Sequence, residues 1–98
     1  MAMLEITIIP LGTGTTSASE FVAEAYRIIR DSGLKFELTP TATVIEGDID
    51  RLFEIARKVH ESPFNQGVKR VVSVIKIDDR RDKEITIEGK KQSVLRKV

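Results

Sequence analysis

The chain opens with an alternation of apolar and other residues that predicts a β-strand over residues 3–9. Leu4, Ile6 and Ile8 stand at every second position, with Glu5 and Thr7 between them. This period of two is typical of a strand that turns one face to a core. The proline that follows at once is expected to end the strand, because proline cannot donate a hydrogen bond to a sheet ladder.

Two later segments repeat their apolar residues with the spacing of amphipathic helices. The first begins at a Ser-Ala-Ser-Glu sequence, which predicts a capping box with Ser17 as N-cap and Glu20 reaching back. The second follows Asp48, which is placed to cap it, and ends before Pro63. Both helices should be amphipathic and should pack on the sheet through one face.

Aromatic residues are few, so their placement in these helices matters for the expected core. Phe21 in the first helix and Phe53 in the second are both expected in the core. The rest of the core must come from Val, Ile and Leu, because aromatics make up only 5% of the chain and there is no Trp.

Three further segments rich in β-branched or alternating apolar residues predict strands over 34–38, 43–46 and 68–77. The resulting order, β-α-β-β-α-β, is that of the split βαβ or ferredoxin-like arrangement. We therefore expect an α+β fold in which two helices cover one face of a four-stranded antiparallel sheet.

The 98 residues are expected to form one domain, residues 1–98, with a core of about 3–79 and a short C-terminal extension over 80–98. Residues 85–98 fit either a short edge strand or a C-terminal helix. The charged stretch 78–83 fits a solvated turn or a salt-bridged contact that fixes a subunit arrangement.

The face of the sheet away from the helices is expected to be partly apolar. Its predicted members are Ile9, Val72 and Val74, among Thr7, Glu5 and Lys76. Such a face matches water poorly, so we expect a second subunit to cover it. A ligand cleft at the subunit boundary is compatible with this arrangement.

Composition excludes several kinds of function. The chain has no Cys, which excludes disulfides, thiolate metal sites and a cysteine nucleophile. His60 is the sole histidine, so we expect no metal site and give His60 a structural or surface role. The net charge is +1, and the aromatic pattern of RNA-binding sheets is missing, so no nucleic-acid partner is expected.

Two further features narrow the expected location and function of the protein. No apolar run approaches the length of a membrane span, and the first ten residues lack the pattern of a signal peptide, so we expect a cytoplasmic protein without membrane contact. Residues 11–16 contain no Arg or Lys, which argues against a phosphate-binding hydrolase of the same topology, such as an acylphosphatase.

Three spaced motifs resemble those of a small family of thiamine-binding proteins, which includes the YkoF-like proteins. They are Ile9-Pro10-Leu11-Gly12-Thr13-Gly14 with Thr16-Ser17 and Phe21-Val22, then Thr43-Val44-Ile45-Glu46-Gly47-Asp48, and finally Val71-Val72 with Lys76 to Lys83. The resemblance implies a ferredoxin-like fold and assembly as dimers or tetramers through the sheets. It implies binding of thiamine or its hydroxymethylpyrimidine part as a ligand, with no turnover, no catalytic residue and no cofactor.

A thiamine pocket needs polar partners for the aminopyrimidine and an apolar wall, and the resemblance directs attention to six residues. The residues expected at the ligand are Glu46, Thr43, Thr16, Ser17, Phe36 and Ile9. Most of them also have a plain structural explanation. Glu46 fits a solvated acid at a strand end, and Thr43 fits a residue that favours strands. Ser17 fits a helix cap, and Phe36 fits a core residue.

Spacing limits how these residues can share a ligand. Thr43 lies three positions before Glu46, so a regular strand puts the two on opposite faces. The backbone N–H groups of the loop that opens the first helix can hold a ligand oxygen. The alternative function is an oligomeric regulatory domain that senses another small molecule.

Overall fold

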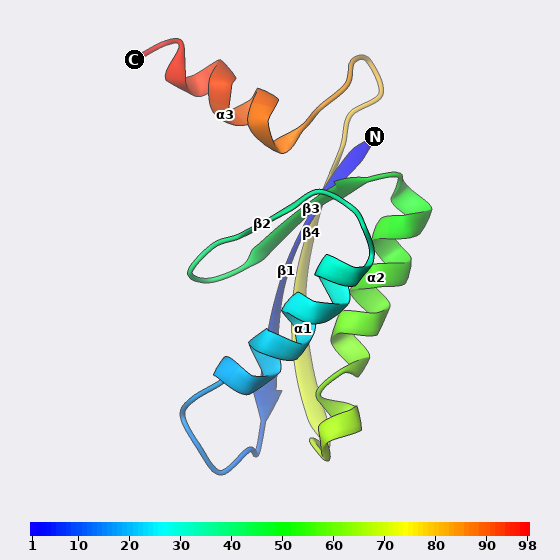
Figure 1. Ribbon diagram of the computed structural model, residues 1–98, viewed down its shortest axis with the longest axis vertical. Helices are drawn as coiled ribbons and strands as arrows, with labels where there is room; N and C mark the ends of the chain where they lie inside the picture. The colour runs from blue at the N-terminus through cyan, green and yellow to red at the C-terminus, as the bar shows by residue number, and fades with distance from the viewer.

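The computed structural model describes residues 1–98 and contains eight short elements (Figure 1). They are β1 (Ala2–Leu11), α1 (Ser19–Asp31), β2 (Phe36–Leu38), β3 (Thr43–Gly47), α2 (Ile49–Glu61), the 3₁₀ turn η1 (Phe64–Gln66), β4 (Arg70–Asp79) and α3 (Ile87–Leu95). The predicted order β-α-β-β-α-β is confirmed, and α3 follows it.

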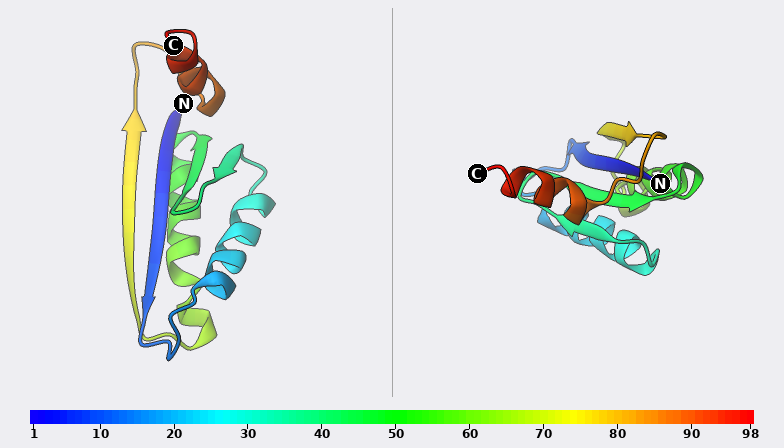
Figure 2. Two further views of the ribbon diagram at one scale, coloured as in Figure 1. Left: turned by 90° about the vertical axis from the view of Figure 1, so that its left-hand side faces the viewer. Right: turned by 90° about the horizontal axis from the view of Figure 1, so that it is seen from above.

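The four strands form one antiparallel sheet in the order β2-β3-β1-β4. The long ladder joins β1 to β4 from Ala2 opposite Asp79 to the far end of both strands, whereas the β1–β3 ladder stops at Ile6 opposite Thr43. Helices α1 and α2 lie side by side on one face (Figure 2). The expected ferredoxin-like α+β fold is confirmed.

The core lies between the two helices and the sheet face that they cover. Leu4, Ile29, Ile45 and Leu52 are completely buried there. Leu4 pairs with Ile45 across β1 and β3, as expected when alternate residues of both strands turn toward the same helices. The apolar stripes of α1 and α2 close over these side chains.

Local signals set the ends of α2 as predicted. The Asp48 side chain accepts a hydrogen bond from the Arg51 N–H at 3.0 Å, which satisfies one of the free donors of the first turn. The helix ends at Glu61, and the buried Ser62 hydroxyl donates to the Val59 carbonyl at 2.7 Å before Pro63 stops the helical ladder.

Two helical predictions were wrong. The N-cap of α1 is Ala18 without a side-chain cap, so Ser17 and Glu20 form no capping box. The Ser17 N–H instead bonds to the Thr15 hydroxyl at 3.2 Å, which holds Ser17 in the loop. Phe53 is 53% exposed, because its neighbour Leu52 takes the inward position of α2.

The C-terminal extension is a helix rather than an edge strand, and polar contacts hold it at one end of the sheet. Ile85 is buried, but no residue of α3 is. The Ile87 N–H donates to Glu46 Oε2 at 2.7 Å on β3. Lys90 pairs with Asp78 on β4, and Lys91 pairs with Glu37 on β2. The helix therefore reaches three strands through hydrogen bonds and ion pairs.

The sheet face away from α1 and α2 is open over most of its length, as predicted. Val74 is 57% exposed, and Ile9 and Val72 are also exposed. The ladder places Ile9 opposite Val72, and Lys76 lies 3.6 Å from the Glu5 carboxylate. We refer to this surface as the open face. None of the three helices has the length and apolar character needed to cross a membrane.

Candidate functional site

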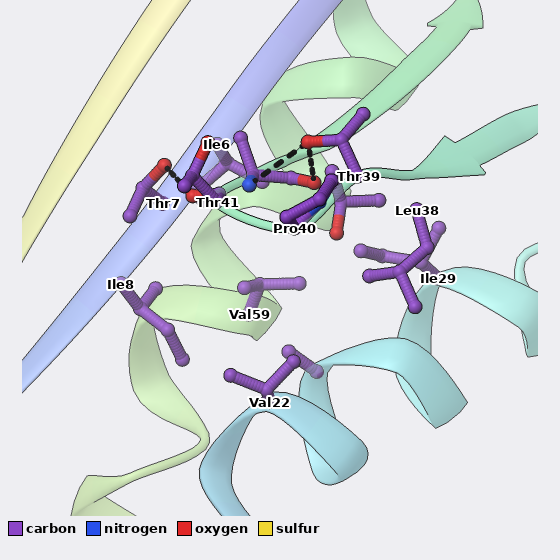
Figure 3. Close-up of a pocket in the computed structure, with 13 residues that line it drawn as sticks. Ile6, Thr7, Ile8, Val22, Ile29, Leu38, Thr39, Pro40, Thr41 and Val59 are labelled. Atoms are coloured by element: carbon purple, nitrogen blue, oxygen red, sulfur yellow. Dashed lines mark hydrogen bonds between the residues drawn. The ribbon is translucent and has the colours of Figure 1, made fainter. Parts of the chain in front are cut away.

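A cavity of about 90 Å³ lies between the sheet, both long helices and the turn that joins β2 to β3 (Figure 3). Its wall on the sheet side includes Ile6 and Ile8, and its wall on α1 includes Val22 and Ile29. The remaining wall is the continuous segment 38–43. The cavity thus lies where the β2–β3 turn approaches α1.

The wall of the cavity is apolar with a few hydroxyl groups and no charged side chain. Its hydroxyls belong to Thr7, Thr39, Thr41 and Thr43. The hydroxyls of Thr7 and Thr39 bond to backbone groups of the β2–β3 turn. The cavity is therefore suited to a neutral, flat group that offers one polar edge.

Thr41 and Thr43 carry the two hydroxyls of the wall that take part in no hydrogen bond of the chain, and Thr43 is the buried one of the two. The residue is 8% exposed, and its hydroxyl takes part in no hydrogen bond of the chain. No fully enclosed side-chain oxygen or nitrogen lacks a partner. The Thr43 oxygen is therefore not completely enclosed, and the residue belongs to the wall of the cavity. A hydroxyl both donates and accepts, so it can serve either kind of ring atom.

The volume of the cavity is smaller than one aromatic ring needs. An apolar cavity of about 150 Å³ is enough to hold benzene, and sites for drug-sized ligands occupy about 300–1,000 Å³. At about 90 Å³ the cavity has space for part of one ring. A larger ligand must extend out of the mouth, where Val22 and Leu38 are exposed.

The six residues expected at the ligand do not converge on one site, although Glu46 and Phe36 both line a second, shallower cleft of about 560 Å³ beside the start of α3. Thr43 faces the helices and lines the cavity, whereas Glu46 pairs with Met3 on the opposite face of the sheet. This is the face relation that the spacing predicted. Glu46 is 6% exposed, and its Oε2 accepts the Ile87 N–H, so it fixes the start of α3.

The other four residues lie away from the cavity. Thr16 and Ser17 are exposed in the loop before α1. Phe36 packs edge-to-face on Tyr26 with ring centroids 5.4 Å apart, which gives it a place at the core margin. Ile9 lies on the open face. Among the six, only Thr43 contributes to the cavity wall.

Within the wall segment 38–43, the sequence directed attention to Thr43 but left residues 39–42 only as the connection between two predicted strands. Threonine recurs there at positions 39, 41 and 43, on both sides of a proline. That recurrence beside a predicted strand is the signal that can identify a wall with several hydroxyls.

His60 and the charged turn after β4 have structural contacts. His60 Nδ1 lies 2.6 Å from the Ser73 hydroxyl, which ties the end of α2 to β4. No group of three or more His, Asp or Glu side chains is arranged to hold a metal ion. The turn is closed by its own ion pairs, and the hydrogen bond from Arg81 lowers the pKa of Asp79.

Comparison with known proteins gives the family. The family described as "Thiamine-binding protein" matches residues 4–95. The UPF0045 protein YqgV of Bacillus subtilis strain 168 is 45% identical over 98 residues, covering 96% of this chain and 94% of that protein. A UPF0045 protein of Methanothermobacter thermautotrophicus is 37% identical over 99 residues and covers both chains completely.

Solved structures agree with this assignment. The crystal structure of the hypothetical protein MJ1052 from Methanocaldococcus jannaschii superposes with a TM-score of 0.88 at 41% identity, over 95% of this chain and 94% of that one. A protein of Thermotoga maritima, TM0486, whose name refers to thiamine biosynthesis or salvage, superposes with a TM-score of 0.79 at 25% identity, over 95% and 97%. The chain belongs to the thiamine-binding protein family.

Proposed function

We propose that this protein binds thiamine or the related hydroxymethylpyrimidine without chemical turnover, and that the aminopyrimidine ring enters the cavity beside Thr43. The observation that carries the proposal is a free hydroxyl in an uncharged apolar cavity, in a chain of the thiamine-binding family. The Thr43 hydroxyl meets the polar edge of the ring, and the partly exposed Ile8 and Val22 contact its faces.

The charge distribution of thiamine supports this orientation. The thiazolium ring carries a positive charge, and burying a cation without a partner is costly. No carboxylate lines the cavity. The thiazolium therefore stays at the mouth, and the pyrimidine supplies most of the binding free energy.

The same lining supports binding rather than catalysis. Proton transfer and nucleophilic attack use carboxylate, imidazole, amine or thiol groups, or a hydroxyl beside a base. The cavity wall contains hydroxyls with no base among its other residues. Neither a cofactor nor a metal is part of the proposed function.

The open face supports the proposal that the protein assembles as a homodimer or homotetramer. Ile9, Val72 and Val74 form an exposed apolar row along two strands. Leu95, the last residue of α3, and Val98 beyond it are exposed as well. A second copy of the chain that covers these side chains removes them from water.

The test is calorimetric titration with thiamine, thiamine phosphate and hydroxymethylpyrimidine. We expect saturable binding, with hydroxymethylpyrimidine within about tenfold of thiamine, because a tenfold change is about 1.4 kcal/mol. Thr43→Val should weaken both ligands, whereas Thr16→Val, at an exposed hydroxyl outside the cavity, should not.

Three results contradict the proposal. Absence of heat with every ligand at two temperatures leaves the sensing of another small molecule as the better function. Thiamine binding more than a hundredfold tighter than that of hydroxymethylpyrimidine places the main contact at the thiazolium. Loss of affinity in Thr16→Val alone moves the site to the loop before α1.

A further inference from the structure

The turn between β2 and β3 is a small rigid unit. The Thr39 N–H donates to the Ala42 carbonyl at 2.9 Å, and the Thr39 hydroxyl donates to the same carbonyl at 2.8 Å. That hydroxyl also accepts the Ala42 N–H at 3.1 Å. Pro40 fixes one backbone angle between them. Segment 39–42 is therefore expected to move as one body.

This unit has few ties to the rest of the molecule. It projects past the end of the β1–β3 ladder, whose last pair is Ile6 with Thr43. The other flank, β2, is a three-residue edge strand that pairs only with β3. Beyond the two flanking strands, the hydrogen bond that ties the turn to the body runs from the Thr7 hydroxyl to the Thr41 carbonyl, at 2.9 Å (Figure 3).

The position of the turn over the cavity gives this hydrogen bond a role. Segment 38–43 forms one wall, and its residues Leu38, Pro40 and Thr41 are exposed on the outer side. Because the cavity has space for only part of one ring, this wall must move outward before a whole ring fits inside.

We propose that segment 39–42 is a flap that admits the ligand and that Thr7 is the positioning residue that holds the flap closed. The identity of the ligand rests on the proposed function, whereas the flap itself does not. The bond is exposed to water. An exposed neutral hydrogen bond shifts an equilibrium by about two- to tenfold, so the flap opens readily and closes by preference.

The chain offers closely matched variants for a test. Thr7→Val removes the hydroxyl and keeps the β-branched shape that suits a strand, and Thr7→Ser restores a hydroxyl. Thr13→Val is the control, because the Thr13 hydroxyl likewise donates to a backbone carbonyl, that of Thr15, at 3.0 Å in an exposed loop outside the cavity.

Two measurements separate the flap from the ligand. Stopped-flow exchange of bound hydroxymethylpyrimidine should show dissociation about two- to tenfold faster in Thr7→Val, a rate near the wild type in Thr7→Ser, and no change in Thr13→Val. Methyl relaxation dispersion of Leu38 and Val22 in the ligand-free protein should show more of the open state in Thr7→Val alone.

The outcomes decide the two proposals separately. If hydroxymethylpyrimidine does not bind the wild type, the proposed function fails, and the dispersion measurement still decides the flap. Unchanged dispersion in Thr7→Val refutes the flap, whether or not the ligand binds. A change of equal size in Thr13→Val, or the absence of recovery in Thr7→Ser, refutes the role of Thr7.

Discussion

Replacing Thr43 by valine should raise the stability of the protein and lower its affinity for the ligand. The substitution exchanges a hydroxyl for a methyl group of similar size. Thr43 is 8% exposed and lines the cavity, and its hydroxyl makes no hydrogen bond within the chain. The folded protein therefore loses no internal bond, whereas the bound ligand loses one.

The substitution should change the free energy of unfolding and the free energy of ligand binding by similar amounts, stabilising the fold and weakening binding. The Thr43 hydroxyl loses part of its hydration without gaining a protein partner, which costs about 0.5–2 kcal/mol, so its removal should stabilise the fold by up to about 1 kcal/mol. In a domain of this length, about 1 kcal/mol raises the melting temperature by about 4–8 °C. Loss of a hydrogen bond that leaves a ligand atom unpaired should weaken binding by about 1–2 kcal/mol, or roughly five- to thirtyfold.

Thr39, another threonine of the cavity wall, provides the contrasting case. The Thr39 hydroxyl makes two hydrogen bonds to Ala42, at 2.8 and 3.1 Å, so Thr39→Val should destabilise the fold by about 1–3 kcal/mol. Urea unfolding of both variants gives the stabilities, and calorimetry with hydroxymethylpyrimidine gives the affinities. A Thr43→Val protein that is less stable than the wild type, or that binds with unchanged affinity, refutes this assignment of the hydroxyl.

Two other contacts lead to predictions at the end of the sheet that carries α3. Glu46→Ala should release the start of α3, which is measured as faster amide exchange at Ile87. Glu46→Gln keeps an acceptor oxygen, so it should retain the helix, and it should retain the affinity for hydroxymethylpyrimidine because Glu46 lies outside the cavity. Loss of binding in the glutamine variant contradicts this. The hydrogen bond from Arg81 lowers the pKa of Asp79 from its ordinary value of 3.8, so the stabilising contribution of this pair is present above that value and is lost as the pH falls through the lowered pKa. Carboxyl NMR titration should show the Asp79 midpoint moving up toward 3.8 in Arg81→Gln, and an unchanged midpoint rejects the pair.

The fold was predictable because local patterns and packing agree along most of the chain. The alternation of Leu4, Ile6 and Ile8 places the same side of β1 against the helices as the structure does. Asp48 and Pro63 mark the start and end of α2 where expected. Each signal acts over a few residues, so the sequence is enough to detect it.

The predictions that failed depended on small rotations or on competing hydrogen bonds. Phe53 and Leu52 are adjacent in α2, and the helical period allows only one of them to point fully inward. Ser17 has the spacing of an N-cap, but its own N–H bonds to Thr15 and keeps it in the loop. Neither outcome is visible in the spacing alone.

The candidate site was only partly predictable for a different reason. Strand spacing correctly separated Thr43 from Glu46, because alternation is a local property. The cavity depends on how closely the β2–β3 turn approaches Val22 on α1, and the intervening chain does not encode that distance in any local pattern. The role of Glu46 likewise required α3, whose conformation the sequence left open.

Thr7 links the two faces of the sheet, and this leads to one more expected outcome. It stands opposite Val74 on the open face, and its hydroxyl holds the Thr41 carbonyl of the flap. A second copy that covers the open face would remove water from this hydrogen bond and so strengthen it. Release of the ligand should then be slower from the assembled protein than from the monomer.

The variant that separates these states is Val74→Lys, because Val74 is 57% exposed and its replacement disturbs no core contact. Light scattering should show a smaller mass for this variant and the wild-type mass for Phe53→Lys, which adds the same charge at an equally exposed apolar residue on the helical side. Hydroxymethylpyrimidine should leave the Val74→Lys monomer faster. An unchanged mass excludes the open face as the interface. A smaller mass with an unchanged release rate refutes the link between assembly and the flap. The variant would then be a monomer whose flap stays closed as well as that of the assembled protein.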